Sequence, residues 1–332
     1  MQNYVRIAGT GSYLPEKILT NFDLEKMVET SDEWIRTRTG IAQRHIAAKD
    51  EATSDMGAVA ATNALEMAGM TPEDIDLIIV ATITPDVPFP NTGCYIQKKI
   101  GAKNATAFSV EAACSGFVFA SDVAVSMLDG KRYKRALVVG AEKMSSIVDW
   151  EDRSTCVLFG DAAGAMILEA VENEEENSYI GAQLGTDGNF SDILYVPGGG
   201  SRMPLDEIAL NEKLNCLRMS GQEVFKQAVN TMSRVSVDLL GQTGIDFDQV
   251  RWLVPHQANI RIINAIRKKL RLPEERCYVN VDRIGNSSAA TIPVAIDEIV
   301  RNGDIQKGDL LLTVAFGGGL TWGSSILRWT KD

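Results

Sequence analysis

The sequence predicts an α/β fold made of two similar halves. Short apolar runs typical of buried strands alternate with longer stretches whose apolar residues recur at helical spacing. Residues 71–80 (TPEDIDLIIV) also resemble residues 243–254, and further local similarity appears in the same order in each half. We therefore predict a duplicated α/β unit, with residues 1–172 and residues 173–332 as its halves. Two unrelated α/β domains are the alternative interpretation.

The first half shows this alternation most clearly. Residues 54–68 and 117–128 repeat apolar residues three and four positions apart, which predicts helices, and Gly130 ends the second one. The short apolar runs between such stretches predict buried strands. In chain order we expect strand 5–8, helix 54–68, strand 77–82, helix 91–100, strand 107–110, helix 117–128, strand 136–141 and two strands within 156–169, broken around Gly160 and Asp161.

An acidic stretch at residues 169–177 is predicted to be a solvated connector to the second half. Beyond it, apolar runs and amphipathic stretches follow one another again. The expected elements are helix 222–240, strand 250–254, helix 259–270, helix 289–300, strand 310–315 and strand 324–329.

Composition argues against several classes of protein. A net charge of −11 disfavours nucleic-acid binding, and no apolar stretch reaches the roughly 20 residues that cross a bilayer. The N-terminus lacks the features of a signal peptide, so we expect a cytoplasmic protein. Five widely spaced cysteines without a C-x-x-C pair argue against a disulfide framework and a zinc site. Because dinucleotide, Walker and H-E-x-x-H motifs are also missing, we expect no metal and no bound cofactor.

Cys114 is the most informative residue of the chain. It lies in the segment VEAACSGF, between a predicted strand and a predicted helix, and its small neighbours allow a sharp turn. The unpaired N–H groups and the dipole at a helix N-terminus stabilise a thiolate, which predicts a reactive thiol. The ordinary alternative is a small, buried, apolar cysteine.

Three other segments carry residues that could act with this sulfur. His256 follows a predicted strand and precedes a helix, where functional loops gather in α/β sheets. Asn286 precedes another predicted helix, so it is either functional or a helix N-cap. The glycine-rich segment 316–323 contains Gly318. It could bring backbone N–H groups close to a ligand, as an oxyanion hole requires, or simply form a tight hairpin.

The order Cys, His, Asn also occurs in papain-type proteases. The C-G-[SA]-C-[WY] signature of that family is missing, and Cys114 lies far from the N-terminus. A secretory signal is missing as well. A cysteine protease is therefore the weaker interpretation.

Four motifs resemble 3-oxoacyl-[acyl-carrier-protein] synthase III, the condensing-enzyme family that starts fatty-acid synthesis. They are AACSGF at 112–117, VPHQAN at 254–259, GNSS at 285–288 and FGGG at 316–319, and residues 31–41 match the N-terminal signature of the family. The resemblance covers essentially the whole chain. It implies the thiolase fold, with two similar α/β halves stacked in five αβαβα layers, and an active homodimer.

The resemblance also implies a catalytic set of Cys114, His256 and Asn286. Acyl-CoA would acylate Cys114, with the backbone N–H groups of Cys114 and Gly318 holding the oxyanion. Malonyl-acyl carrier protein would then lose CO₂ while His256 and Asn286 donate hydrogen bonds to its thioester carbonyl. Both reactants are substrates, so no resident cofactor is implied. Three related classes fit the sequence less well. Elongating condensing enzymes use Cys–His–His, and thiolases need a second cysteine in the glycine loop. Plant-type chalcone synthases share Cys–His–Asn but are longer.

The same match assigns the residues that bind substrate. Trp34, Arg38 and Arg153 resemble the positions that hold CoA, where an aromatic face and guanidinium groups suit the ligand. A core role for Trp34 and a surface role for Arg153 are the alternatives. Phe89 resembles the residue that closes the acyl pocket of the partner subunit. The other substrate-binding positions are Asn259 and Phe316.

A basic helix face after His256 suggests a docking surface for an acidic carrier protein. Its residues are Arg261, Lys268 and Lys269, and the alternative is a set of cations that complete a helix C-terminus. Leu320 stands where many relatives carry an aromatic residue, so acetyl, longer straight and branched starters are all compatible with the sequence. A secondary-metabolite relative and a catalytically silent subunit that binds acyl-CoA are the functional alternatives.

Overall fold

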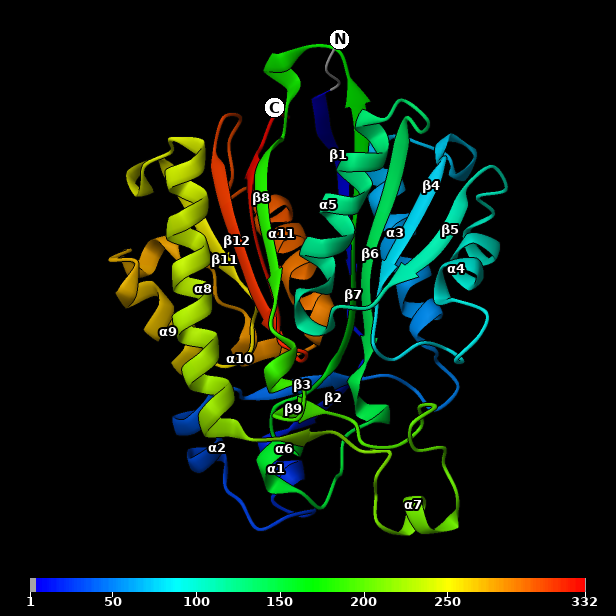
Figure 1. Ribbon diagram of the computed structural model, residues 1–332, viewed down its shortest axis with the longest axis vertical. Helices are drawn as coiled ribbons and strands as arrows, with labels where there is room; N and C mark the ends of the chain where they lie inside the picture. The colour runs from blue at the N-terminus through cyan, green and yellow to red at the C-terminus, as the bar shows by residue number, and fades with distance from the viewer. Residues whose placement is uncertain (1–3, 332) are drawn as a thin grey trace.

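Two mixed β-sheets form the frame of the molecule in the computed structural model, which describes residues 4–331 (Figure 1). The first sheet has the order β1 (Tyr4–Tyr13), β7 (Asp161–Val171), β6 (Arg135–Lys143), β4 (Leu77–Ala81) and β5 (Thr106–Val110). The second sheet has the order β8 (Tyr179–Thr186), β13 (Thr321–Arg328), β12 (Leu310–Gly317) and β11 (Val250–Pro255).

The two sheets repeat one strand order and one set of strand directions. In the first, β1 pairs antiparallel with β7, β7 antiparallel with β6, and β6 parallel with β4. In the second, β8, β13, β12 and β11 pair with the same directions in the same sequence. At the place of β5 the second sheet has only a parallel bridge between Leu253 and Cys277. We propose on this basis that residues 1–172 and 173–332 are duplicated halves.

Helices cover both sheets and separate them, which produces the five αβαβα layers (Figure 1). Helices α3 (Thr53–Ala68) and α4 (Thr92–Ile100) pack on the outer face of the first sheet, and α8 (Gly221–Thr243) and α9 (Ile260–Lys269) lie outside the second. Helices α5 (Gly116–Asp129) and α11 (Thr291–Arg301) lie between the sheets. Most residues of α11 are buried on several sides of the helix, as expected of a helix between two layers.

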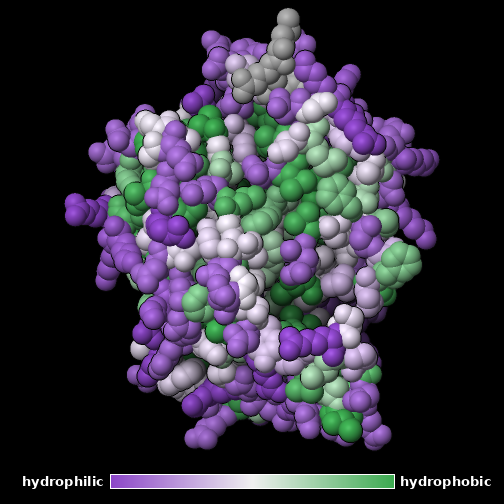
Figure 2. All heavy atoms as spheres, in the orientation of Figure 1, coloured by the Kyte–Doolittle hydropathy of each residue, from purple (hydrophilic) through white to green (hydrophobic). Residues whose placement is uncertain are grey.

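Smaller elements gather at the lower end of the molecule in Figure 1, where the N-terminal ends of α5 and α11 also lie. They are β2 (Lys17–Thr20), β3 (Gln43–Ile46), β9 (Leu194–Tyr195), β10 (Arg218–Met219), α1 (Asn21–Leu24), α2 (Asp32–Thr39), α6 (Arg153–Cys156), α7 (Glu207–Asn211) and α10 (Val281–Ile284). Hydrophobic side chains gather toward the middle of the face in Figure 2, and hydrophilic ones dominate its edges. Among the described residues, no helix is both long and apolar enough to span a membrane.

The prediction of two strands within residues 156–169 is wrong. The chain forms α6, then an irregular buried stretch, and then the single strand β7. The backbone of this stretch bonds to the Asn286 loop, because Asn286 N–H donates to the Leu158 carbonyl and Gly160 N–H donates to the Asn286 carbonyl. The apolar run before Gly160 therefore bonds to the Asn286 loop, and it does not form a separate strand of the sheet.

The predicted acidic connector also begins too early. Glu169 lies within β7 and is largely buried, and its carboxylate pairs with Arg6 at 2.6 Å and with Arg135 at 2.7 Å. These two guanidinium groups explain how a carboxylate can occupy a strand. The connector itself is the short segment between β7 and β8.

Candidate active site

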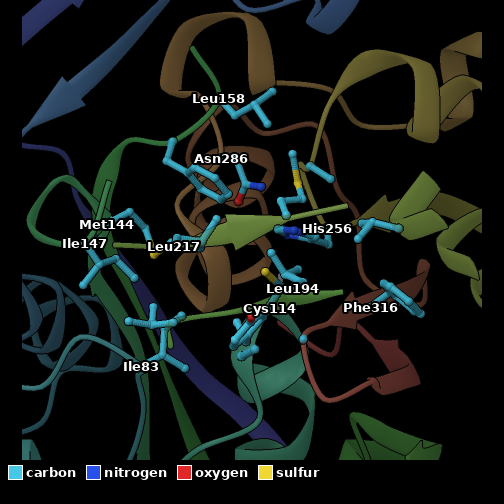
Figure 3. A pocket seen from close by; sticks show the side chains of 18 of the residues that line it. Ile83, Cys114, Met144, Ile147, Leu158, Leu194, Leu217, His256, Asn286 and Phe316 are labelled. Atoms are coloured by element: carbon cyan, nitrogen blue, oxygen red, sulfur yellow. The ribbon is translucent and has the colours of Figure 1, made fainter. Parts of the chain in front are cut away.

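The predicted catalytic residues line one cavity of about 1150 Å³ (Figure 3). Cys114 comes from the first half of the chain, whereas His256 and Asn286 come from the second. Cys114 lies just before α5, His256 directly after β11, and Asn286 just before the turn that opens α11. Their side chains extend into the same part of the cavity (Figure 3). The site therefore forms only when the two halves pack together.

The turn that carries Cys114 is tied to the glycine-rich loop. Thr321 Oγ1 donates to the Ala112 carbonyl at 2.9 Å and lies 2.7 Å from Ser115 Oγ. A Cβ atom at Gly317 would lie only 2.7 Å from the Cys114 nitrogen, so a side chain at this position would collide with the turn that carries Cys114. Glycine is thus required here for close approach of two backbones.

Burial dominates the acidity of the Cys114 thiol. Cys114 is 8% exposed, and burial raises its pKa to about 12, with the Ser288 hydroxyl lowering it and the Glu142 carboxylate raising it. The expectation that the helix N-terminus favours a thiolate in the free protein is therefore wrong. The thiol carries its proton at neutral pH, and deprotonation must accompany attack on a substrate.

His256 is held by its backbone neighbours and is uncharged. The backbone N–H of His256 donates to the Val314 carbonyl at 2.8 Å, and the ring nitrogen Nδ1 lies 2.7 Å from Thr291 Oγ1. Burial lowers its pKa to about 3, so the imidazole is neutral at physiological pH. The adjacent Gln257 is fully buried and its amide bonds to the carbonyls of Pro255 and Tyr278, which fixes the loop.

Asn286 is not a helix N-cap, because Ser287 is the N-cap of the 3-10 turn before α11. Asn286 Oδ1 accepts the Ser288 N–H at 2.9 Å. Its backbone is fixed by the bonds to Leu158 and Gly160 described above. Because the amide oxygen is engaged in this way, the Nδ2 group is the part of the side chain that can donate toward the cavity.

Glu142 is a buried carboxyl beside this site that the sequence analysis did not single out. It follows the apolar core of β6 and accepts hydrogen bonds from Thr82, Thr84 and the Ile83 N–H at 2.6 to 3.2 Å. Burial raises its pKa to about 7 despite these donors. The signal that could have revealed it is an acidic residue at the end of an otherwise apolar strand.

The raised pKa of Glu142 predicts a pH-dependent stability. Between pH 4.5 and about 7, the folded state keeps a proton that the unfolded state has lost. The free energy of unfolding should therefore fall as pH rises through this window, by on the order of 3 kcal/mol from this residue, and level off above it. Glu142→Gln should remove this slope in urea unfolding. An identical pH dependence in the variant and the wild type would show that Glu142 is not the cause.

The predicted CoA-binding residues form a cluster at the cavity. The guanidinium carbon of Arg153 lies 4.8 Å from the centre of the Trp34 ring, and that of Arg38 lies 5.9 Å from it. Trp34 and Arg38 line the cavity, whereas Arg153 and Phe89 are outside its lining. Phe89 is 87% exposed, so within one chain it closes no pocket.

The other predicted substrate-binding residues lie at the cavity as well. Asn259 lines it, although its Oδ1 also accepts the Ile262 N–H at 3.0 Å and so caps α9. Phe316 and Gly318 line the cavity, but Leu320 is only 2% exposed and packs in the core outside that lining.

The basic face of α9 has the exposure that docking requires. Arg261, Lys268 and Lys269 are all exposed, while the apolar stripe of the same helix faces the core. Arg261 also lines the cavity and lies over the Phe225 ring at 5.7 Å. Lys268 and Lys269 lie outside the lining, and Lys269 Nζ donates to Asn230 Oδ1 at 2.7 Å.

Comparisons with known proteins agree with this geometry. Residues 108–188 match the family model described as 3-oxoacyl-[acyl-carrier-protein (ACP)] synthase III, and residues 240–329 match the model of its C-terminal part. The chain is 51% identical to the beta-ketoacyl-[acyl-carrier-protein] synthase III of Caldanaerobacter subterraneus subsp. tengcongensis, over 98% of each chain. It is 53% identical to that of Thioalkalivibrio sulfidiphilus, over 98% of this chain and 99% of the relative.

A solved structure gives the same result for the fold. The crystal structure of 3-oxoacyl-[acyl-carrier-protein] synthase III from Aquifex aeolicus is 46% identical and superposes with a TM-score of 0.90, over 98% of this chain and all of that one. High identity and structural agreement both extend over essentially the full length. The chain belongs to the 3-oxoacyl-[acyl-carrier-protein] synthase III family.

Proposed function

We propose that this protein is an acyltransferase that starts fatty-acid synthesis by condensing an acyl-CoA primer with malonyl-acyl carrier protein. The product is a 3-oxoacyl carrier protein, and the reaction passes through an acyl group on Cys114. The observation that carries the proposal is the shared cavity of Cys114, His256 and Asn286 in a chain of this family. The decarboxylative condensation needs a nucleophile and two neutral hydrogen-bond donors, and these three side chains can supply them.

In the first step, the Cys114 sulfur attacks the thioester carbonyl of acyl-CoA. The carbon–sulfur bond to CoA breaks, and the proton lost by the thiol ends on the CoA thiol, so the exchange is proton-neutral. The backbone N–H groups of Cys114 and Gly318 stabilise the oxyanion that forms in between. The high pKa of the buried thiol requires that proton loss and attack be coupled.

In the second step, the malonyl thioester loses CO₂ and an enolate develops on its carbonyl oxygen. His256 and the Nδ2 group of Asn286 donate hydrogen bonds to this oxygen. Because the imidazole is neutral, it stabilises the enolate without delivering a proton that would quench it. The carbanion then attacks the acyl group on Cys114 and forms the new carbon–carbon bond, while the acyl carbon–sulfur bond breaks and the released thiolate takes a proton from water.

The cavity has the composition that these substrates need. Most of its wall is apolar, which suits an acyl chain, and Trp34 and Arg38 at the cavity suit an adenine ring and phosphates. Arg153, stacked on the same indole ring, completes the proposed CoA site. Phe89, exposed on one chain, is proposed to close the acyl pocket of a partner subunit in a homodimer. Five free cysteines are consistent with our proposal of a cytoplasmic location.

The α9 surface predicts a separation of the two half-reactions. Reversing Lys268 and Lys269 to glutamate should raise the KM for malonyl-acyl carrier protein by about tenfold, because attraction to an acidic partner is lost. Arg261 is left in place in this test because it lines the cavity. Self-acylation from acyl-CoA should change by less than about twofold. Steady-state kinetics with each substrate measure both effects.

Lys134→Glu is the matched control for this surface. Lys134 is exposed beyond the C-terminal end of α5, at the opposite end of that helix from Cys114. The control should leave the KM for carrier protein unchanged. If the α9 variant and the control behave alike, the docking surface lies elsewhere.

A turnover assay tests the proposed function. The protein is incubated with malonyl-acyl carrier protein and a panel of acetyl-, longer straight-chain and branched acyl-CoA donors, and the carrier protein is analysed by mass spectrometry. We expect a 3-oxoacyl carrier protein with at least one donor. Hydrolysis alone, or no change with every donor, would contradict the proposal.

A further inference from the structure

Thr291 is a fully buried residue whose hydroxyl touches the His256 ring. It opens α11, and its Oγ1 lies 2.7 Å from His256 Nδ1 and 3.0 Å from the Ser288 carbonyl oxygen. A threonine hydroxyl has one proton and can donate it to only one of these acceptors. The choice decides which nitrogen of the neutral imidazole holds the ring proton.

The local backbone favours donation to the ring. The Ser288 carbonyl already accepts the backbone N–H of Thr291 in the 3-10 turn before α11, so it does not need the hydroxyl as well. The contact with Nδ1 is also the shorter of the two. When the hydroxyl donates to Nδ1, that nitrogen carries no proton, and the ring proton lies on Nε2.

We infer that Thr291 is a positioning residue that holds His256 in the tautomer with its proton on Nε2. This inference rests on the proposed function, in which His256 Nε2–H donates to the thioester carbonyl. In the other tautomer, Nε2 would present a lone pair to the carbonyl oxygen, and two acceptors cannot form a hydrogen bond. The buried hydroxyl therefore keeps the imidazole ready for decarboxylation.

Two substitutions test the effect on the chemistry. Thr291→Val keeps the side-chain shape but removes the hydroxyl, whereas Thr291→Ser keeps the hydroxyl. In the valine variant, decarboxylation of malonyl-acyl carrier protein should fall by about 10²-fold while acylation of Cys114 changes by less than about threefold. The serine variant should retain both rates within about threefold. Undiminished decarboxylation in the valine variant, or an equal loss in both variants, would overturn the inference.

The tautomer of His256 can also be determined without measuring turnover. The chain has only two histidines, His45 and His256, so ¹⁵N NMR of the imidazole groups is simple to assign with His45→Gln. The wild type should show the proton of His256 on Nε2, and the valine variant should lose this preference. A wild-type proton on Nδ1 would overturn the inference even in an active enzyme. Failure of the turnover assay would reject the proposed function and leave this spectrum readable.

Discussion

Cys114→Ala is expected to abolish condensation, with kcat lowered by more than about 10³-fold, because the acyl group must be held on this sulfur before the carbon–carbon bond can form. Intact-protein mass spectrometry should show an acyl adduct on the wild type after addition of acyl-CoA and none on the variant. Decarboxylation of malonyl-acyl carrier protein should continue in the variant, since His256 and Asn286 are unchanged.

Cys94→Ala is the matched control for this result. Cys94 is half-buried, whereas the other four cysteines are buried, so Cys94 is the thiol most open to non-specific acylation. The control should form the adduct and condense at the wild-type rate. An adduct that persists in Cys114→Ala and disappears in Cys94→Ala would place the nucleophile elsewhere.

The second large effect is expected from the two proposed donors. His256→Ala and Asn286→Ala should each lower the rate of malonyl decarboxylation by about 10²- to 10³-fold, the usual cost of losing one donor to an oxyanion. Acylation of Cys114 by acyl-CoA should be affected far less, because neither side chain belongs to its proposed oxyanion hole. The measurements are the release of labelled CO₂ and the formation of the acyl adduct, each made on the same preparation.

His45→Ala provides the control for the loss of an imidazole. His45 lies in β3 outside the cavity lining, with its Nδ1 2.6 Å from the Pro15 carbonyl oxygen. Its replacement should leave both half-reactions intact. If acylation and decarboxylation fall equally in the His256 and Asn286 variants, the two side chains support the cavity and do not act as separate donors.

The alternation of apolar runs and amphipathic stretches predicted most of the large elements. Helices α3, α5, α8 and α9 and strands β4 and β6 lie within a few residues of their predicted positions, because each has a strong period and a clear end. The strand predicted at residues 5–8 was too short, because β1 continues through Gly9 and Gly11 to Tyr13. In the structure these glycines let α3 pack closely on the strand, which local sequence cannot reveal.

The motifs predicted which residues line the cavity, but the protonation states of these residues depend on how they are packed. Cys114, His256 and Asn286 line one cavity, as their motifs implied. The thiolate expected at Cys114 was wrong, since burial raises the pKa of this thiol to about 12. Thr291 was missed because a threonine at a helix start carries no sequence signal, whereas Glu142 was missed although it ends an otherwise apolar strand. Tertiary folding within each half brings Glu142 near Cys114 and Thr291 against His256.

A single-turnover experiment tests the central claim most directly. Wild-type protein is first acylated with labelled acyl-CoA, freed of excess donor, and then mixed with malonyl-acyl carrier protein in a quenched-flow instrument. The label on Cys114 should disappear at the same rate as labelled 3-oxoacyl carrier protein and CO₂ appear. A label that stays on the protein while product forms, or that leaves as free acid, would contradict an acyl-Cys114 condensing mechanism.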